Sequence, residues 1–271
     1  MAEPMNWLDL AGRSCVITGA GGGIGNALAR AFAAAGTRLM LLDLDAVRLQ
    51  ALADELRAAG ADVIARDCNV ADQASVEAAE AAVGEAFGGA DILVNNAGIL
   101  RAGALADLSL ADWNTLLSIN LTGYFLCAQA FGRNMREKGR GSIVHIGSIA
   151  GQVPQGFSGA YSVSKAGVSM LSRGLATEWG EYGVRSNLVC PAMIRTPMSE
   201  AIYADPEITK RRIAAVPMRR VGTPEDIADA AVFLARDRAG YITGEALLRA
   251  GAWRKNMLGL VPRPGFDRPP A

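Results

Sequence analysis

Strand-like runs alternate with helix-like segments along most of the chain, and this alternation constrains the fold more than any other feature. Short apolar runs occupy residues 14–18, 38–42, 62–65, 92–95, 142–146 and 185–190. The Ala-rich segments between them, such as 25–35 and 46–59, are long enough to be crossover helices. This pattern predicts an α/β fold: a Rossmann-like, doubly wound parallel β-sheet with helices on both faces, in three α/β/α layers. Ligands of such sheets bind at the carboxyl ends of the strands.

The domain organisation follows from length and from the lack of linkers. A chain of 271 residues fits one α/β domain, and no internal repeat or Ser/Gly linker divides it. We therefore expect a single domain over residues 1–271. Residues 193–220 are richer in charge, Met and Pro than their surroundings, which predicts an irregular or helical insertion on the substrate side. Residues 254–271 form a C-terminal tail whose four prolines oppose regular structure.

Charge and hydropathy exclude several classes of partner. The 27 basic and 27 acidic residues cancel, so neither nucleic acid nor an anionic membrane is an expected partner. No run of about 20 uncharged apolar residues could span a bilayer. The first ten residues contain acidic groups and no apolar core of a signal peptide, so we expect a cytoplasmic protein.

Cysteine and histidine usage argues against a metal site. The cysteines at 15, 68, 127 and 190 are scattered and form no CxxC pair, so we expect small buried side chains in a reducing compartment. The single histidine, His145, lies inside a strand-like run. We interpret it as structural, and we expect no bound metal.

A glycine-rich turn follows the first strand and opens a helix. Residues 18–25 read Thr-Gly-Ala-Gly-Gly-Gly-Ile-Gly. Glycines allow a close approach of the backbone to a pyrophosphate, and the helix N-terminus offers free N–H groups. The spacing differs from G-x-G-x-x-G, and a purely structural turn would look similar. The strand–turn–helix context favours dinucleotide binding, with Gly19, Gly22, Gly23 and Ile24 as contacts.

Asp43 ends the next strand, 18 residues after Gly25. A carboxylate there can accept hydrogen bonds from both ribose hydroxyls of the adenosine half and would repel a 2′-phosphate. No Arg or Lys lies within the glycine turn or directly after Asp43. A solvated aspartate at a strand end is the alternative. The pattern favours NAD as cofactor over NADP.

Tyr161 and Lys165 lie four residues apart, so on a helix they share one face. A phenol titrates near pH 10, and a neighbouring ammonium would lower its pKa. The pair could then serve as acid and base for an alcohol or a carbonyl oxygen. A surface pair on an ordinary helix would show the same spacing.

Taken together, these motifs resemble those of the short-chain dehydrogenase/reductase family, in its single-domain, NAD-dependent form, over about residues 10–253. The glycine turn matches TGxxxGxG, and residues 95–98 match the family's NNAG. Asn120, Ser148, Tyr161 and Lys165 match the family's catalytic tetrad in order and spacing. Agreement of all these motifs by chance is very improbable.

The resemblance implies a role for each member of the tetrad. Tyr161 exchanges the proton of the substrate oxygen, and Ser148 hydrogen-bonds the same oxygen. Lys165 holds the nicotinamide ribose and lowers the Tyr161 pKa. Asn120 holds a water that links Lys165 to solvent. The cofactor supplies the hydride chemistry, whereas the protein positions the reactants and moves the proton.

The resemblance also implies further cofactor contacts and an assembly. The contacts are Asn69 (where the family usually has Asp), Val70, Asn96, Gly98, Ile194 and Thr196. Ala192 stands where Gly is usual, which leaves the local backbone in question. Residues 250–253 read Ala-Gly-Ala-Trp in place of Asp-Gly-Gly-Trp, which could alter a subunit contact. Family members are commonly tetramers, so we expect a homotetramer and consider that the tail crosses to a neighbouring subunit.

The substrate pocket is expected between the loop 148–161 and the insertion after Pro191. Its candidate residues are Ser148, Ile149, Gln152, Gln155, Phe157, Met193, Met198 and Ile202. Two glutamines hint at a hydroxylated substrate, and Met and Ile add apolar contact. A sugar, a small cyclic alcohol and an oxoacyl thioester remain open.

The leading functional hypothesis is transfer of a hydride between NAD(H) and a secondary alcohol or ketone (EC 1.1.1.-), with Tyr161 as general acid/base. The alternative is a non-catalytic dinucleotide-binding sensor or scaffold, against which the complete tetrad argues. Reduction of a C=C bond is a third possibility. It is disfavoured because the family's enoyl reductases usually space Tyr and Lys more widely.

Overall fold

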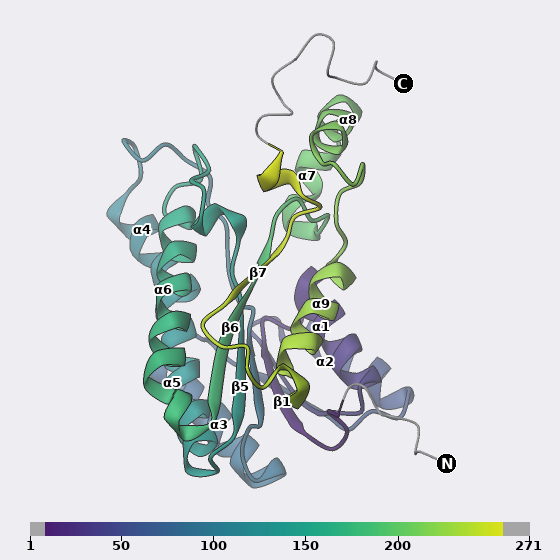
Figure 1. Ribbon diagram of the computed structural model, residues 1–271, viewed down its shortest axis with the longest axis vertical. Helices are drawn as coiled ribbons and strands as arrows, with labels where there is room; N and C mark the ends of the chain where they lie inside the picture. Colours follow the sequence, from purple (N-terminus) through teal and green to yellow (C-terminus); the bar gives the residue numbers. More distant parts are fainter. Residues whose placement is uncertain (1–8, 257–271) are drawn as a thin grey trace.

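A seven-stranded parallel sheet forms the centre of the computed structural model, which describes residues 9–256 (Figure 1). Its strands are β1 (Ser14–Thr18), β2 (Arg38–Asp43), β3 (Val63–Asp67), β4 (Ile92–Asn95), β5 (Gly141–Ile146), β6 (Val184–Pro191) and β7 (Ala246–Arg249). The spatial order is β3-β2-β1-β4-β5-β6-β7, and every neighbouring pair is parallel. The predicted α/β class is confirmed; β7 is a strand that the sequence pattern did not predict.

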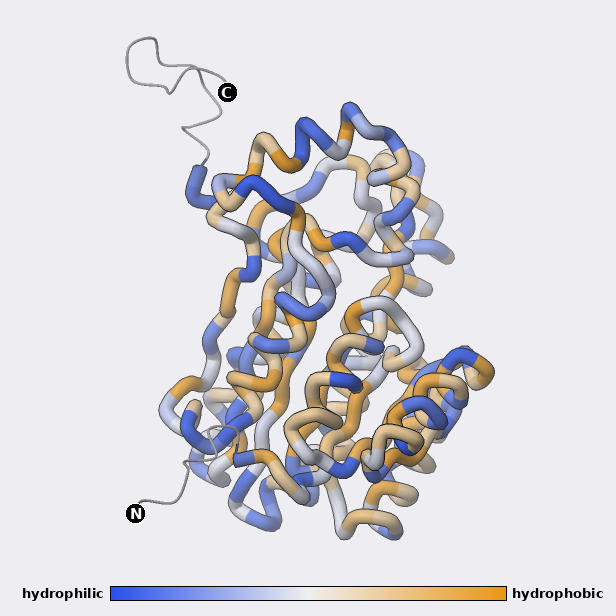
Figure 2. The backbone as a smooth tube through the Cα atoms, turned by 90° about the vertical axis from the view of Figure 1, so that its right-hand side faces the viewer, coloured by the Kyte–Doolittle hydropathy of each residue, from blue (hydrophilic) through white to orange (hydrophobic). Residues whose placement is uncertain are grey.

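Helices cover both faces of this sheet (Figure 1). One face carries α1 (Gly23–Ala34), α2 (Ala46–Ala58) and α9 (Pro224–Ala235), and its core includes Leu28, Phe32 and Ile227. The other face carries α3 (Gln73–Phe87), α4 (Leu110–Leu117), α5 (Gly123–Glu137) and α6 (Tyr161–Trp179). Figure 2 shows hydrophobic and hydrophilic residues interspersed along the helices. Burial of the sheet on both faces explains why its strands read as continuous apolar runs.

The strand order reverses between β1 and β4, which are neighbours in the sheet although β2 and β3 separate them in sequence. Such a switch point opens a crevice at the carboxyl ends of the strands. Residues 193–220 lie at this end and contain α7 (Glu200–Tyr203), α8 (Pro206–Ala215) and a short 3₁₀ turn (Pro197–Ser199). The expected insertion over the sheet edge is thus largely helical.

A π-helical turn, Ser118–Thr122, joins α4 to α5. With this turn, α4 and α5 form one almost continuous helical segment. The hydrogen bonds of a π-helix join residues five apart, whereas those of an α-helix join residues four apart. Asn120 lies at the centre of the turn and is fully buried. The irregular turn therefore directs a polar side chain inward.

At two positions, Ala192 and Ala252, alanine stands where the family pattern has glycine. Ala192 does not adopt a positive φ, so the missing glycine there causes no strain. Ala252, in contrast, has φ +66°, a left-handed conformation that costs an alanine roughly 1 kcal/mol. Its place in the family pattern belongs to glycine, which adopts this conformation freely.

All four cysteines are buried and unpaired, as predicted. His145 lies in β5, also as predicted. Over residues 9–256, the helices are too short or too polar to cross a bilayer. Most of the predicted tail, residues 257–271, lies outside the described residues, so the idea that it reaches a neighbouring subunit stays a prediction.

Candidate active site

One cavity of about 480 Å³ runs from the glycine turn to Tyr161 along the carboxyl edge of the sheet. It brings together most of the residues that the sequence assigned to the cofactor and to catalysis. They are Gly19, Gly22, Gly23, Ile24, Asp43, Asn69, Val70, Asn96, Gly98, Ser148, Tyr161, Lys165, Ile194 and Thr196.

The glycine turn offers an anion-binding end to this cavity. Helix α1 begins at Gly23, and its N-cap, Gly22, provides no side-chain cap. The first amide groups of α1 thus point to the cavity without a side-chain acceptor, beside the positive end of the helix dipole. At Gly19, φ is +65°, and a Cβ would lie 2.7 Å from the Ala97 Cα, so only glycine fits. These features suit the diphosphate of a dinucleotide.

Asn96 holds the glycine turn in place. Its side-chain amide donates to the carbonyl oxygens of Thr18 and Gly19, at 3.0 and 2.9 Å. In return, the Thr18 hydroxyl accepts the backbone N–H of Asn96, at 3.0 Å. The Asn96 side chain therefore acts as a brace between β1 and β4 as well as a wall of the cavity.

Asp43 lines the cavity next to the glycine turn. Its two carboxylate oxygens accept the backbone N–H groups of Gly21, at 2.9 Å, and Asp45, at 3.0 Å. Arg48, on the first turn of α2, lines the same end of the cavity and pairs with Asp45 at 3.2 Å. Arg48 was not predicted from the sequence, because it lies five residues after Asp43 and not directly after it.

The cavity wall between the two ends contains Asn69, Val70 and Gly98. The Asn69 amide oxygen, expected to accept from an adenine, accepts the N–H of Ala71 at 3.1 Å. A carbonyl oxygen has a second lone pair, so one acceptor site is left. Gly98 lies against Asn120, whose amide oxygen would be 3.2 Å from an added Cβ.

Tyr161 opens α6 and shares the catalytic end of the cavity with Ser148, which follows β5. Burial raises the pKa of Tyr161 above its usual value of 10.0, and a hydrogen bond with the Ser148 side chain opposes this rise. Lys165 is not among the causes of the shift. Desolvation of the phenol therefore dominates, and the expected lowering of the Tyr161 pKa by Lys165 stays a prediction.

Lys165 is a buried cation held by oxygen atoms. Its ammonium donates to the Ile146 carbonyl at 2.9 Å and to the Tyr124 hydroxyl at 3.2 Å. It lies 5.9 Å from the centre of the Tyr161 ring. Burial lowers the Lys165 pKa to about 8. Tyr124, which the sequence analysis did not single out, positions the lysine from α5 and itself donates to the Ile146 carbonyl at 3.0 Å.

Asn120 links the loop at Ile99 to helix α6. Its amide oxygen accepts the Ile99 N–H at 2.8 Å, and its amide nitrogen donates to the Ile99 carbonyl at 2.9 Å. The same nitrogen approaches the Ser164 hydroxyl at 3.3 Å, one residue before Lys165. Its side chain thus fixes the backbone beside the cavity, whereas the predicted water stays a prediction.

His145 takes no part in the cavity. Its ring stacks on Tyr124 with centroids 5.8 Å apart, and its two nitrogens meet Asn95 and Ser186 at 3.3 and 3.2 Å. Burial, with a smaller effect of the Lys165 charge, lowers the His145 pKa to about 3. The ring is therefore neutral at physiological pH and supports the sheet.

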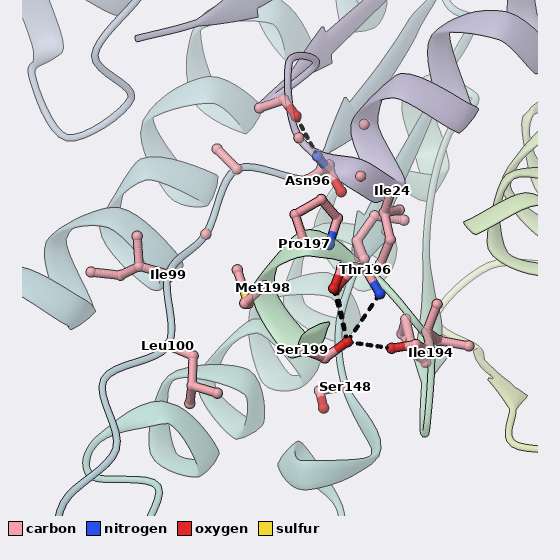
Figure 3. Close-up of a pocket in the computed structure, with 18 of the residues that line it drawn as sticks. Ile24, Asn96, Ile99, Leu100, Ser148, Ile194, Thr196, Pro197, Met198 and Ser199 are labelled. Atoms are coloured by element: carbon pink, nitrogen blue, oxygen red, sulfur yellow. Dashed lines mark hydrogen bonds between the residues drawn. The ribbon is translucent and has the colours of Figure 1, made fainter. Parts of the chain in front are cut away.

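The predicted substrate residues divide into two groups. Gln155, Met193, Met198 and Ile202 line the cavity, and so do Ile99 and Leu100, which were not predicted. Figure 3 shows Ile99 and Leu100 on one side and the segment with Thr196 to Ser199 across from them. Ile149, Gln152 and Phe157 do not line it. Gln152 instead accepts from Arg254, and Phe157 is 80% exposed on a loop with φ +57°.

Comparison with known proteins identifies the family of this chain. A family model described as enoyl-(acyl carrier protein) reductase matches residues 19–251. The fold and site define a nicotinamide-dinucleotide oxidoreductase. The chain belongs to the short-chain dehydrogenase/reductase family.

Curated relatives and solved structures extend the comparison over nearly the whole chain. Galactitol 2-dehydrogenase (L-tagatose-forming) of Cereibacter sphaeroides is 41% identical and covers 90% of this chain and 96% of its own. D-threitol dehydrogenase of Mycolicibacterium smegmatis is 42% identical, with 90% and 94% covered. The structure of a gluconate 5-dehydrogenase from Burkholderia cenocepacia J2315, in complex with NADP and tartrate, has a TM-score of 0.88 at 32% identity, with 92% and 98% covered.

The reaction class follows from these relatives. The protein is a dinucleotide-dependent oxidoreductase that acts on the CH–OH group of secondary alcohols. The predicted transfer of a hydride between a nicotinamide cofactor and an alcohol or ketone is thereby confirmed.

Proposed function

We propose that this protein oxidises one secondary hydroxyl of a polyhydroxylated substrate with NAD, and that Tyr161, Ser148 and Lys165 carry the proton chemistry. One observation supports the proposal most directly. A single cavity is lined by the Asp43 carboxylate and the glycine turn at one end, and by Tyr161, Ser148 and Lys165 at the other. The cavity thus has groups for a ribose, a diphosphate and a reacting oxygen in the order that a dinucleotide and its substrate need.

Each residue has a definable task in the oxidation. The chemistry that a bound nicotinamide cofactor would supply is acceptance of the hydride from the substrate carbon. Tyr161 takes the proton of the substrate hydroxyl, and Ser148 donates a hydrogen bond to the same oxygen. Lys165 brings a positive charge to the nicotinamide end and so favours the phenolate of Tyr161 during turnover. In the reverse direction, Tyr161 returns the proton to the carbonyl oxygen.

The choice of NAD rests on Asp43. Two backbone N–H groups fix the Asp43 carboxylate in the position proposed for the ribose, where it disfavours a 2′-phosphate by like-charge repulsion. Two facts weigh against it: Arg48 lines the same end of the cavity, and the Burkholderia relative is described with NADP. Arg48, however, already pairs with Asp45. We therefore propose a preference for NAD, not exclusive use.

The substrate class rests on the cavity lining and on the relatives. Galactitol, threitol and gluconate, named for three relatives, all carry adjacent secondary hydroxyls. In this chain Ser148 and Gln155 supply polar groups, whereas Ile99 and Leu100 supply an apolar wall. A short polyol chain presents hydroxyls on one side and C–H groups on the other, which suits such a surface.

We extend the proposal to the assembly and location that the family resemblance implies. The chain is a cytoplasmic homotetramer of single-domain subunits, each with its own dinucleotide-binding and catalytic site. Light scattering coupled to size-exclusion chromatography tests the assembly, and a mass of one subunit would contradict it.

The function is tested by a substrate panel. The purified protein is assayed for NADH formation with alditols, aldonates and simple secondary alcohols, each with NAD and with NADP. We expect turnover of several polyhydroxylated compounds and a higher kcat/KM with NAD. Binding of NADH, followed by its fluorescence, without turnover of any compound would favour the sensor or scaffold alternative.

A further inference from the structure

Helix α8 brings one cationic side chain to the catalytic cavity. Arg212 lies in the last turn of α8 and lines the cavity together with Met198, Ile202 and Tyr203. Its guanidinium lies 5.3 Å from the centre of the Tyr203 ring and donates to the Tyr203 hydroxyl at 3.4 Å. Tyr203 is buried, so the ring is a fixed support for the guanidinium.

The charge of Arg212 has no counterion among the described residues. Over residues 9–256, no carboxylate forms an ion pair with it. The neighbouring Arg195 makes the contrast clear. Arg195 lies 5.9 Å from the same ring, but its guanidinium bonds both carboxylate oxygens of Glu200, and it does not line the cavity.

The acidic side chains that line the cavity lie at one end of it, where Arg48 pairs with Asp45. These carboxylates, Asp43 and Asp45, lie at the adenosine end. The insertion side contributes Arg212 without any acidic partner there. A partly buried guanidinium without a counterion is costly in free energy, and a bound anion removes that cost.

We propose that Arg212 binds a carboxylate of the substrate, so that the preferred substrate is a hydroxy acid of the aldonate type. This inference rests on the proposed function and names the substrate class of the same site. The planar guanidinium can bind a carboxylate through two parallel hydrogen bonds. Arg212 comes from α8 and Ser148 from the loop after β5, so different elements of the cavity wall would hold the carboxylate and the reacting hydroxyl.

Matched pairs of substrates test the proposal. Galactonate and galactitol, or threonate and threitol, differ only in a carboxylate in place of a terminal CH₂OH. We expect kcat/KM to favour the acid in each pair. Arg212→Gln should lower kcat/KM for the acid by about tenfold to a hundredfold, the usual worth of a charge-assisted hydrogen bond, and leave the alditol almost unchanged. The kcat/KM of Arg212→Lys for the acid should lie between the values of the wild type and of Arg212→Gln. Lysine keeps the positive charge but cannot form the two parallel hydrogen bonds of the guanidinium.

Two controls isolate the contact. Arg211→Gln removes a neighbouring, exposed cation of α8 that does not line the cavity, and should leave both substrates unaffected. NADH affinity, measured by fluorescence, should not change in Arg212→Gln. A loss of NADH affinity, with equal losses for acid and alditol, would show that Arg212 holds the cofactor and would overturn the proposal.

A binding measurement separates this inference from the proposed function. Calorimetric titration of galactonate into the NADH complex of Tyr161→Phe measures binding without turnover. Weaker binding after the added Arg212→Gln change supports the carboxylate contact even if no compound is oxidised. Equal affinity with and without Arg212 overturns it even if the enzyme oxidises alditols rapidly.

Discussion

The Lys165 ammonium lies 5.9 Å from the centre of the Tyr161 ring, one helical turn away on α6, but its hydrogen bonds go to Tyr124 and Ile146. The lysine is thus anchored to β5 and α5 as well as to its own helix. Such anchoring keeps the buried cation at a fixed distance from the phenol.

Tyr161→Phe removes the hydroxyl that exchanges the substrate proton. We expect kcat to fall by about a hundredfold to ten-thousandfold, the usual contribution of a general acid/base. NADH binding, followed by fluorescence, should persist because the ring remains in place. Retention of near-normal kcat in both directions would assign the proton transfer to another group.

Lys165→Met tests the energetic cost of the buried ammonium. The pKa of Lys165 is lowered to about 8 from 10.5, so below pH 8 the folded protein carries the cost of a buried charge. Between about pH 8 and 10.5 the folded state has released the proton, the unfolded state still holds it, and the cost disappears as pH rises. The shift corresponds to roughly 3 kcal/mol of difference between the two protonation states.

We therefore expect the stability of the wild type, relative to Lys165→Met, to increase as pH rises through this window. Urea unfolding at several pH values measures the difference. A difference that stays constant from pH 7 to 10 would show that the ammonium is not desolvated as described.

Asp43→Asn tests cofactor choice. Loss of the negative charge should narrow the ratio of kcat/KM for NAD over NADP by roughly tenfold, since the repulsion of a 2′-phosphate disappears. In the variant, Arg48 at the same end of the cavity becomes the nearest cation for that phosphate. Adding Arg48→Ala should reverse most of the gain with NADP. An unchanged ratio in Asp43→Asn would refute the ribose assignment.

Ala252→Gly tests the strained backbone near the C-terminal end of the described chain. Glycine tolerates φ +66° without a steric cost, so the substitution should stabilise the protein by up to about 1 kcal/mol. Ala250→Gly, two residues earlier and without a positive φ, should destabilise it. Thermal unfolding of both variants provides the comparison, and equal effects would contradict the local strain.

The fold was largely predictable because the strands are buried on both faces. Residues 14–18 and 92–95 were predicted with the bounds that the structure shows, since continuous apolar runs lie between helices there. Strand β7 was missed because its four residues are half-buried or exposed and end in Arg249. A short edge strand carries too little hydrophobic pattern to stand out.

The candidate site was predictable where chemistry depends on local spacing. Tyr161 and Lys165, four residues apart, and the glycine turn were visible in the sequence. Arg212 and Tyr124 were not, because their roles depend on how α8 and α5 pack against distant segments. Phe157 was wrongly placed in the pocket because a loop with φ +57° turns its ring to solvent.

The π-helical turn Ser118–Thr122 joins α4 to α5 and contains Asn120. The number of residues in this turn therefore determines where the Asn120 side chain points. Each residue of an α-helix advances by about 100°, so deleting one residue of this turn would rotate the Asn120 side chain away from Ile99 and Ser164. Such a deletion would disrupt the site although every remaining residue is unchanged. We therefore expect selection to remove insertions and deletions of one residue in this segment more strongly than most amino-acid substitutions.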